Sequence, residues 1–114
     1  MEDCVFCKIA NGDIPSKKVY EDEDMLCFYD INPEAPVHVL FIPKKHIESI
    51  NDLNEENSYI VSKIFLKMKD VAKKLGIADK GYRIISNCGE DAGQTVHHLH
   101  FHMLGGEKFK TTLL

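Results

Sequence analysis

Four of the chain's six histidines lie between residues 97 and 102, and three of them alternate with apolar residues. Side chains two residues apart in an extended chain point the same way, so His98, His100 and His102 would share one face of a strand. A solvated sheet surface does not need three imidazoles in a row. A neutral imidazole can attack phosphorus, and an imidazolium can stabilise a developing oxyanion. The row therefore predicts phosphoryl chemistry.

The polar loop at residues 87–95 comes directly before this row. Its glycines, Gly89 and Gly93, free the backbone to turn and to offer N–H groups to an anion. A loop suited to an anion that leads into a row of imidazoles favours a phosphate-containing substrate. Gly105 and Gly106 follow the row and are expected to end its strand.

A second group of residues has the types and spacing of metal ligands. Cys4 and Cys7 form a Cys-x-x-Cys pair, His46 follows, and another histidine comes about fifty residues later, at position 97 or 98. Two thiolates and two imidazoles make a closed tetrahedral zinc site of the structural kind, with no position open for water. A redox role for the thiols, or no metal at all, remains an alternative, because a single Cys-x-x-Cys occurs in many contexts.

Two helices and five strands are predicted to position these residues. A short helix at Cys4–Ala10 ends at Asn11 and Gly12. One long helix is expected between Asn51 and Gly76, with Asn54 as its N-cap and an apolar stripe that can lie on a sheet. The strands are expected in 18–31 (two strands around the acidic turn 21–24), 37–43, 81–87 and 96–104. The 37–43 strand is almost continuously apolar, which predicts a central position.

The order α-β-β-β-α-β-β predicts an α+β domain with a five-stranded antiparallel sheet. With 114 residues, the chain has room for a single domain spanning 1–114. A net charge of −4 gives no basic surface for nucleic acid, and no apolar run is long enough to span a membrane. The acidic N-terminus lacks the basic region of a signal peptide, so a cytoplasmic location is expected, with reduced thiols. Cys27 is expected in the core, and Cys88 receives no role.

The run 98–104 resembles the His-x-His-x-His-x-x signature of the histidine triad family, in which x is apolar. It is most similar to small nucleotide-binding members of bacterial type, the branch of purine nucleoside phosphoramidases. Further blocks also resemble the family, in family order, and together they span most of the chain: 4–9, 28–33, 36–38, 42–47 and 93–96.

The resemblance assigns roles to individual residues. It implies that His100 is the nucleophile and that His102 and His38 complete the catalytic group, although His38 could instead be a hydrogen-bonded core histidine. Asp30 stands at the position that binds ribose. The remaining residues implied to bind substrate are the apolar base pocket and the phosphate loop: Phe6, Ile9, Phe28, Ile31, Asn87, Gly93, Gln94 and Thr95. Each apolar one could alternatively belong to the core, and Thr95 stands where many relatives have serine.

The resemblance also implies a zinc site and a dimer. Bacterial-type relatives bind zinc through Cys4, Cys7, His46 and the first triad histidine, here His98, with His97 as the competing ligand. Two protomers are expected to join their sheets into a homodimer. No catalytic metal is required by the expected chemistry.

The expected function is hydrolysis of purine nucleoside 5′-phosphoramidates or related nucleotide conjugates through a nucleotidyl-histidine intermediate, releasing the nucleoside monophosphate. A dinucleoside polyphosphate hydrolase is the first alternative, but such enzymes favour glutamine at the last triad position, where this chain has His102. A non-catalytic nucleotide-binding adaptor and a zinc-stabilised interaction module are the others. The chain has no tryptophan, whereas some relatives close the site with a C-terminal segment bearing one, so leaving-group preference stays open.

Overall fold

The computed structural model describes residues 3–110. The elements follow the predicted order: α1 (Val5–Ala10), β1 (Lys18–Glu21), β2 (Met25–Tyr29), β3 (Val37–Pro43), α2 (Tyr59–Lys74), β4 (Tyr82–Ile85) and β5 (Phe101–Gly105). Two short 3-10 turns, Ile50–Asp52 and Glu90–Ala92, lie in the connections. The end of the C-terminal segment considered in the sequence, residues 111–114, lies outside the described residues.

The strands form one antiparallel sheet in the order β1-β2-β3-β5-β4. The predicted α+β class is therefore confirmed, and β3 is central, as its apolar sequence predicts. The last strand inserts between β3 and β4, and this places the triad segment beside His38 of β3. In the sheet register, His38 pairs with Leu104 and Leu40 pairs with His102.

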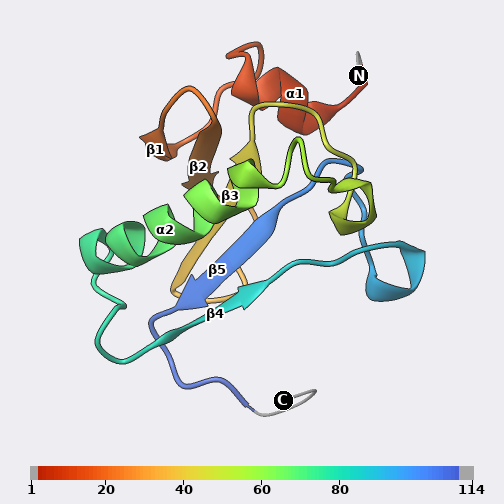
Figure 1. Ribbon diagram of the computed structural model, residues 1–114. Coiled ribbons are helices and arrows are strands. Elements are labelled where there is room, and N and C mark those ends of the chain that lie inside the picture. Colours follow the sequence, from red (N-terminus) through yellow and green to blue (C-terminus); the bar gives the residue numbers. More distant parts are fainter. Residues whose placement is uncertain (1–2, 111–114) are drawn as a thin grey trace.

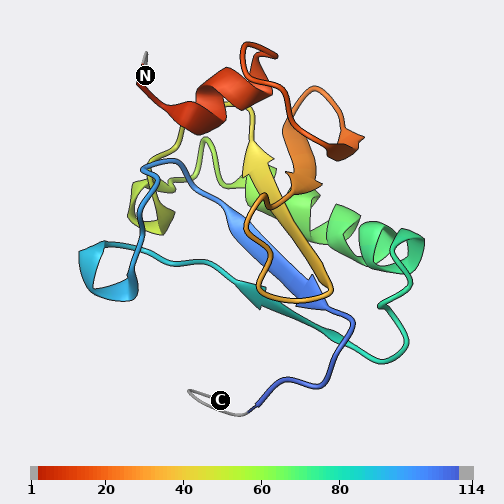
Figure 2. The same ribbon diagram turned by 180° about the vertical axis from the view of Figure 1, so that it is seen from behind.

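The two helices lie on opposite faces of the sheet (Figures 1 and 2). The stripe of α2, with Ile60, Ile64 and Met68, packs in one buried cluster with β-strand residues such as Phe41 and Met103. On the other face, Phe6 of α1 packs with residues of β2 and β3: Leu26, Phe28, Leu40 and Ile42. The alternation in the triad segment sends Leu99, Phe101 and Met103 to the α2 side and leaves the histidines for the α1 side.

The long helix begins later than predicted, at Tyr59 with Ser58 as N-cap. Asn54 does bind backbone N–H groups, those of Glu56 and Asn57 at 2.8 and 2.9 Å, but it caps a separate turn. The side chain of Asn57 stabilises that turn, because its Oδ1 accepts from the Asn54 N–H at 2.8 Å. The predicted N-cap is therefore wrong: Asn54 caps the turn before α2, and the helix begins after that turn.

The last strand is also shorter than the predicted 96–104, since its ladder begins only at Phe101. The Leu99 N–H donates to the Ile47 carbonyl at 2.6 Å, outside the sheet, so residues 98–100 follow a loop instead of a neighbouring strand. At the other end, Gly105 lies against the 75–81 connection, where an added Cβ would stand 2.8 Å from Ile77 Cδ1. The strand predicted at 81–87 is likewise reduced to Tyr82–Ile85.

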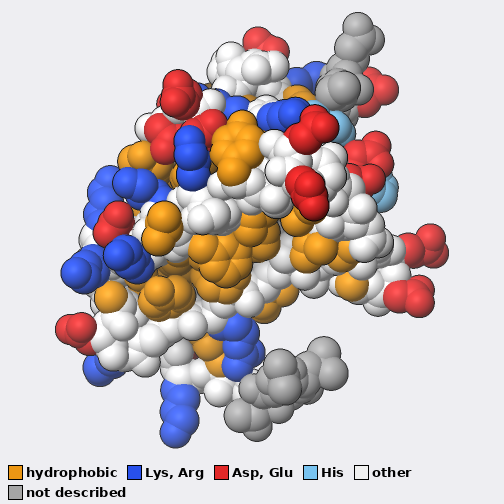
Figure 3. Space-filling view, in the orientation of Figure 1, with side chains coloured by type: hydrophobic (Ala, Val, Ile, Leu, Met, Phe, Trp, Pro, Cys, Tyr) orange, Lys and Arg blue, Asp and Glu red, His pale blue; other side chains and the backbone are white. Residues whose placement is uncertain are grey.

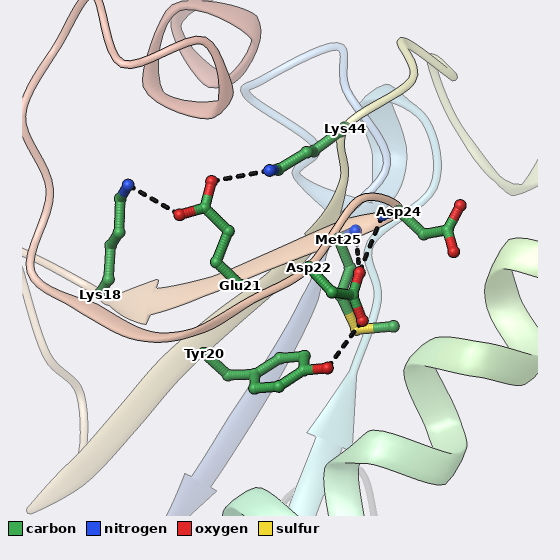
Figure 4. Close-up of polar contacts among 7 residues, drawn as sticks. All are labelled: Lys18, Tyr20, Glu21, Asp22, Asp24, Met25 and Lys44. Carbon is green, nitrogen blue, oxygen red and sulfur yellow. Dashed lines mark hydrogen bonds and ion pairs between the residues drawn. The ribbon is translucent and has the colours of Figure 1, made fainter.

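The acidic turn predicted between the first two strands is held by its own side chains (Figure 4). Asp22 Oδ1 accepts from the N–H groups of Asp24 and Met25 at 2.8 and 3.0 Å, and Asp22 Oδ2 accepts from the Tyr20 hydroxyl at 2.8 Å. Glu21 is paired with Lys18 and Lys44 at 2.8 and 2.7 Å. These bonds fix the start of β2, the strand that leads to Asp30.

Among residues 3–110, no helix has the length and apolar character needed to cross a membrane.

Candidate functional site

Five histidines form a row on the α1 face of the sheet. Ring centroids are 5.0 Å apart for His46 and His98, 5.2 Å for His100 and His102, and 5.1 Å for His38 and His102. The Phe6 ring links the two halves of the row, with edge contacts to His98 and His100 at 5.9 and 5.1 Å. Helix α1 thus covers the row, and Cys7 within the helix and Cys4 at its N-cap are two further candidate ligands.

His100 is buried, and its ring is held by the backbone. Its Nδ1 lies 2.7 Å from the carbonyl oxygen of His98, and a carbonyl can only accept, so Nδ1 carries the proton. The lone pair is therefore on Nε2. The carbonyl of His100 itself accepts from the Ser86 hydroxyl at 2.9 Å, which ties the residue to the start of the 87–95 loop. This arrangement gives the imidazole a fixed orientation, with Nε2 as the nitrogen able to attack an electrophile.

His38 and His102 form a hydrogen-bond relay whose direction the backbone sets. The Glu34 N–H donates to His38 Nδ1 at 3.0 Å, so the proton of His38 is on Nε2. That Nε2 lies 2.9 Å from His102 Nδ1, which must accept. His102 consequently keeps its own proton on Nε2, where it can donate to an oxygen or a leaving group. His38 is a buried, fully hydrogen-bonded histidine, and the residue it contacts is a member of the triad.

Asp30 lies beside this relay, with Oδ2 at 3.4 Å from His38 Nε2 and Oδ1 accepting from the Asn32 N–H at 2.8 Å. The three side chains Asp30, His38 and His102 are close enough to surround an ion. However, a histidine that binds metal normally donates its second ring N–H to a neighbour. His38 accepts at Nδ1 instead, so its Nε2 holds a proton, and the donor set does not suit a metal.

Burial lowers the pKa of His102 to about 4, and the neighbouring His100 and His38 add to the effect while Asp30 opposes it. His102 is therefore neutral at pH 7. The hydrogen bonds of the relay decide which ring nitrogen of His38 and of His102 carries the proton.

The predicted metal ligands Cys4, Cys7, His46 and His98 converge, with all their ligand atoms within 4.8 Å of one another. Cys7 Sγ lies 3.2 Å from His46 Nδ1 and 3.5 Å from His98 Nδ1, and Cys4 Sγ lies 3.2 Å from His98 Nδ1. Bond lengths of about 2.3 Å for Zn–S and about 2.0 Å for Zn–N place the sulfur and nitrogen corners of a tetrahedron roughly 3.5 Å apart. The group fits a four-coordinate ion of the zinc type.

His98 has the second hydrogen bond expected of a metal ligand. Its Nε2–H donates to the Pro43 carbonyl at 2.8 Å, which leaves the Nδ1 lone pair facing the sulfurs. Burial lowers the pKa of His98 to about 4, which favours the neutral form that binds metals. The competing residue, His97, is exposed and lies outside this group of four.

Burial favours the metal-binding form of His98, but it disfavours the metal-binding thiolate form of Cys7. Burial and the neighbouring Cys4 raise the pKa of Cys7 to about 11, so without a cation the thiol is protonated. A bound metal would replace that proton. Cys27 has no such partner: it is fully buried in the α2-side core, and burial raises its pKa to about 12, in keeping with its predicted core role.

The predicted phosphate loop runs beside the triad, and its residues lie in different environments. Asn87 is half-buried, while Gly93 and Thr95 are exposed. Thr95 lines a hollow of about 330 Å³ beside His46 and His97. Gln94 is buried, and its side-chain amide is bonded to Gly89, Glu48 and Val96, so its polar atoms face the protein interior.

The residues predicted to form the base pocket also differ in burial. Phe6 and Phe28 are buried and in edge contact, with ring centroids 5.8 Å apart, and Ile9 packs against the same cluster. Ile31, next to Asp30, is 92% exposed, so it does not belong to the core.

Three contributors to the site are backbone groups, which residue types and spacing could not predict: the Glu34 N–H, the Pro43 carbonyl and the His98 carbonyl. Ser86 was also missed, because a serine at a strand end carries no distinguishing signal.

Comparisons with known proteins agree with this geometry. A family model described as "Scavenger mRNA decapping enzyme C-term binding" matches residues 3–112. Protein HitA of Neisseria gonorrhoeae is 46% identical over 105 residues, which cover 92% of this chain and 97% of that protein. An uncharacterized HIT-like protein of Helicobacter pylori is 50% identical over 105 residues, covering 91% of this chain and 97% of the relative.

Solved structures match over nearly the whole chain. A HIT family hydrolase from Clostridium thermocellum has a TM-score of 0.96 and 53% identity, covering 100% of this chain and 99% of that one. A histidine triad protein from Clostridium difficile has a TM-score of 0.94 and 51% identity, with 96% of each chain covered.

Proposed function

The chain belongs to the histidine triad family, and on that premise we propose that it hydrolyses purine nucleoside 5′-phosphoramidates or related nucleotide conjugates. The observation that carries the proposal is the bond from His100 Nδ1 to the His98 carbonyl, which leaves Nε2 as a free nucleophile. That the solved relative from Clostridium thermocellum is described as a hydrolase supports the general class of reaction.

The reaction proceeds in two displacements. His100 Nε2 attacks the phosphorus, the P–N bond to the leaving amine breaks, and the amine departs with a proton taken up from solvent, while His102 Nε2–H donates a hydrogen bond to a non-bridging phosphate oxygen. Water then attacks the nucleotidyl-imidazole and gives up a proton to solvent, the P–N bond to His100 breaks, and the nucleoside monophosphate is released. Dividing the displacement in this way replaces one difficult step by two easier ones. His38 acts through His102, since it holds His102 Nδ1 as an acceptor.

The nucleotide is bound by the groups around this row. The Asp30 carboxylate accepts from the ribose hydroxyls, and the exposed Ile31 contacts the base. The backbone N–H groups of the 87–95 loop bind the phosphate oxygens, together with His102 and the side chains of Asn87 and Thr95. The partner of the protein is accordingly a purine nucleotide of the AMP or GMP type.

The four ligands Cys4, Cys7, His46 and His98 bind zinc in a structural role. All four positions of the tetrahedron are taken by protein atoms, so zinc would stabilise the fold and α1 and would not activate water.

The protein forms a homodimer through the free edge of β4. Within residues 3–110 that strand pairs with β5 alone, and an unpaired edge is a template for a second chain. Phe65, half-exposed on α2, packs on the buried Phe101 of β5 with ring centroids 5.4 Å apart, so an apolar surface lies next to that edge. Figure 3 shows hydrophobic side chains gathered on this side of the molecule.

The proposal is tested with adenosine 5′-phosphoramidate as substrate and AMP release followed by chromatography. Wild type should release AMP, and His100→Ala should bind AMP but release none from the substrate. Diadenosine triphosphate, tested in parallel, should be the poorer substrate. If wild type binds AMP tightly without turnover of either compound, the protein is a nucleotide-binding adaptor and the enzymatic proposal is wrong.

A further inference from the structure

The buried side chain of Gln94 joins the two functional parts of the molecule. It is 8% exposed, and its amide makes three hydrogen bonds within the protein. Oε1 accepts from the Gly89 N–H at 2.9 Å, and Nε2 donates to the carbonyls of Glu48 and Val96 at 2.7 and 3.1 Å. Both N–H groups are therefore used, and the amide is not free to donate to a phosphate.

The three partners lie in three different segments. Gly89 belongs to the 87–95 loop, and the Gln94 N–H returns to the Gly89 carbonyl at 3.1 Å, so the two residues close that loop with a reciprocal pair. Glu48 lies two residues after the ligand His46. Val96 lies two residues before the ligand His98. One amide thus fixes the anion loop relative to two of the metal ligands.

Other bonds extend the connection at both ends. The Ile47 carbonyl, next to Glu48, accepts from the Leu99 N–H between His98 and His100. Ser86, which precedes the loop, donates to the His100 carbonyl. A shift of the loop that opens these bonds would therefore leave the buried Gln94 amide without partners and would loosen both sites.

We propose that Gln94 is a positioning residue that couples nucleotide binding at the 87–95 loop to metal binding by Cys4, Cys7, His46 and His98. Each ligand holds the Gln94 bonds in the arrangement that the other requires. Because binding linkage is reciprocal, AMP should raise zinc affinity by the factor by which zinc raises AMP affinity. This inference rests on the proposed nucleotide and zinc sites.

The test measures zinc affinity of the zinc-loaded protein by competition with a chromophoric chelator, with and without saturating AMP. AMP affinity of the zinc-loaded protein is measured by calorimetry. For wild type, AMP should tighten zinc binding by about fivefold or more, a modest coupling by general standards. Gln94→Glu places a carboxylate against the two carbonyls, and Gln94→Ala removes the bonds. Both should reduce the coupling to less than about twofold and weaken AMP binding.

Asn57 provides the matched control. It is a buried amide of similar exposure, 7%, whose Oδ1 accepts from the Asn54 N–H and whose Nδ2 donates to the Asp52 carbonyl at 3.2 Å, in the turn before α2. Asn57→Ala should lower the melting temperature as the Gln94 variants do, yet keep wild-type coupling.

Three results would overturn the inference. In the first, wild type binds AMP but shows the same zinc affinity with and without it, which removes the coupling and leaves the proposed function intact. In the second, the Gln94 variants retain full coupling. In the third, wild type binds no AMP, which overturns the proposed function together with this inference.

Discussion

The imidazole of His100 and the main-chain carbonyl of His98 are joined by a hydrogen bond of 2.7 Å, while the His98 side chain faces Cys4 and Cys7. A single residue therefore belongs to both functional parts: its ring lies in the proposed metal site, and its backbone carbonyl orients the proposed nucleophile. The position of the His98 carbonyl depends on how firmly its ring is held.

Zinc removal should destabilise the fold. Purified protein should contain about one zinc per chain, and at free zinc a hundredfold above its dissociation constant the ion should contribute about 2.7 kcal/mol to the free energy of unfolding. Cys7→Ser should lose the metal and most of that stabilisation, as measured by metal analysis and chemical denaturation. Cys88→Ser, a half-buried cysteine outside the cluster, is the control and should keep both. Full stability of Cys7→Ser would contradict a structural role for zinc.

The pH dependence of folding should report on His102. Its pKa falls from 6.5 to about 4 on folding, so the unfolded chain binds more protons in that interval. Stability from this group is complete above pH 6.5 and is lost as the pH falls toward 4. Between about pH 7.5 and about pH 5, wild type should lose about 2 kcal/mol more than His102→Gln, measured by denaturation at each pH. Equal pH slopes for the two proteins would count against a buried neutral His102, and His97→Gln, at an exposed site, should behave as wild type.

Asp30→Asn should impair ribose recognition. A carboxylate that accepts from two hydroxyls loses charge-assisted bonds worth about 1.5–3 kcal/mol each, which corresponds to an increase in KM of roughly tenfold or more for the ribonucleotide substrate. The variant should no longer distinguish that substrate from its 2′-deoxy form, whereas kcat should change little. Steady-state kinetics with the two substrates provides the measurement. If kcat falls and KM does not, Asp30 acts on the His38–His102 relay instead.

Phe65→Glu should produce a monomer, because it places a charge on the apolar surface beside the free edge of β4. Analytical ultracentrifugation measures the outcome. Leu66→Glu is the control: Leu66 is more exposed, at 62%, but lies beside Tyr20 and Lys63 on the β1 side of α2. A dimer that survives Phe65→Glu would show that the interface lies elsewhere.

The sequence alone was sufficient for the elements, their order and the alternation of the triad. Period-two and helical patterns reflect burial, and the buried clusters on the two faces of the sheet match them. Boundaries were less accurate, because Asn54 caps a turn instead of the helix, and because Leu99 bonds to Ile47 instead of to a strand. The positions of both boundaries depend on contacts that the local sequence pattern does not contain.

The sequence predicted which residues the candidate site would contain, but it could not predict their hydrogen bonds. The structure brings Cys4, Cys7 and His46 together with His98, and His97 lies outside this group. The tautomers of His38, His100 and His102 could not be deduced, since they are set by backbone groups at Glu34 and His98. Gln94 was expected to face phosphate, and its long-range bonds to Glu48 and Gly89 could not be anticipated from its neighbours in the chain.

The hydrogen-bond partners of the three histidines also determine how the site can attract an anion. Within residues 3–110, the hydrogen bonds and the ion pair of His38, His100 and His102 involve only histidine, Asp30 and backbone or hydroxyl groups, with no lysine or arginine. Recognition of a phosphate would then rest on N–H dipoles instead of full positive charges. Dipolar contacts act at short range, so added salt, which screens charges over about 10 Å at 0.1 M, should hardly alter the rate at which substrate is captured.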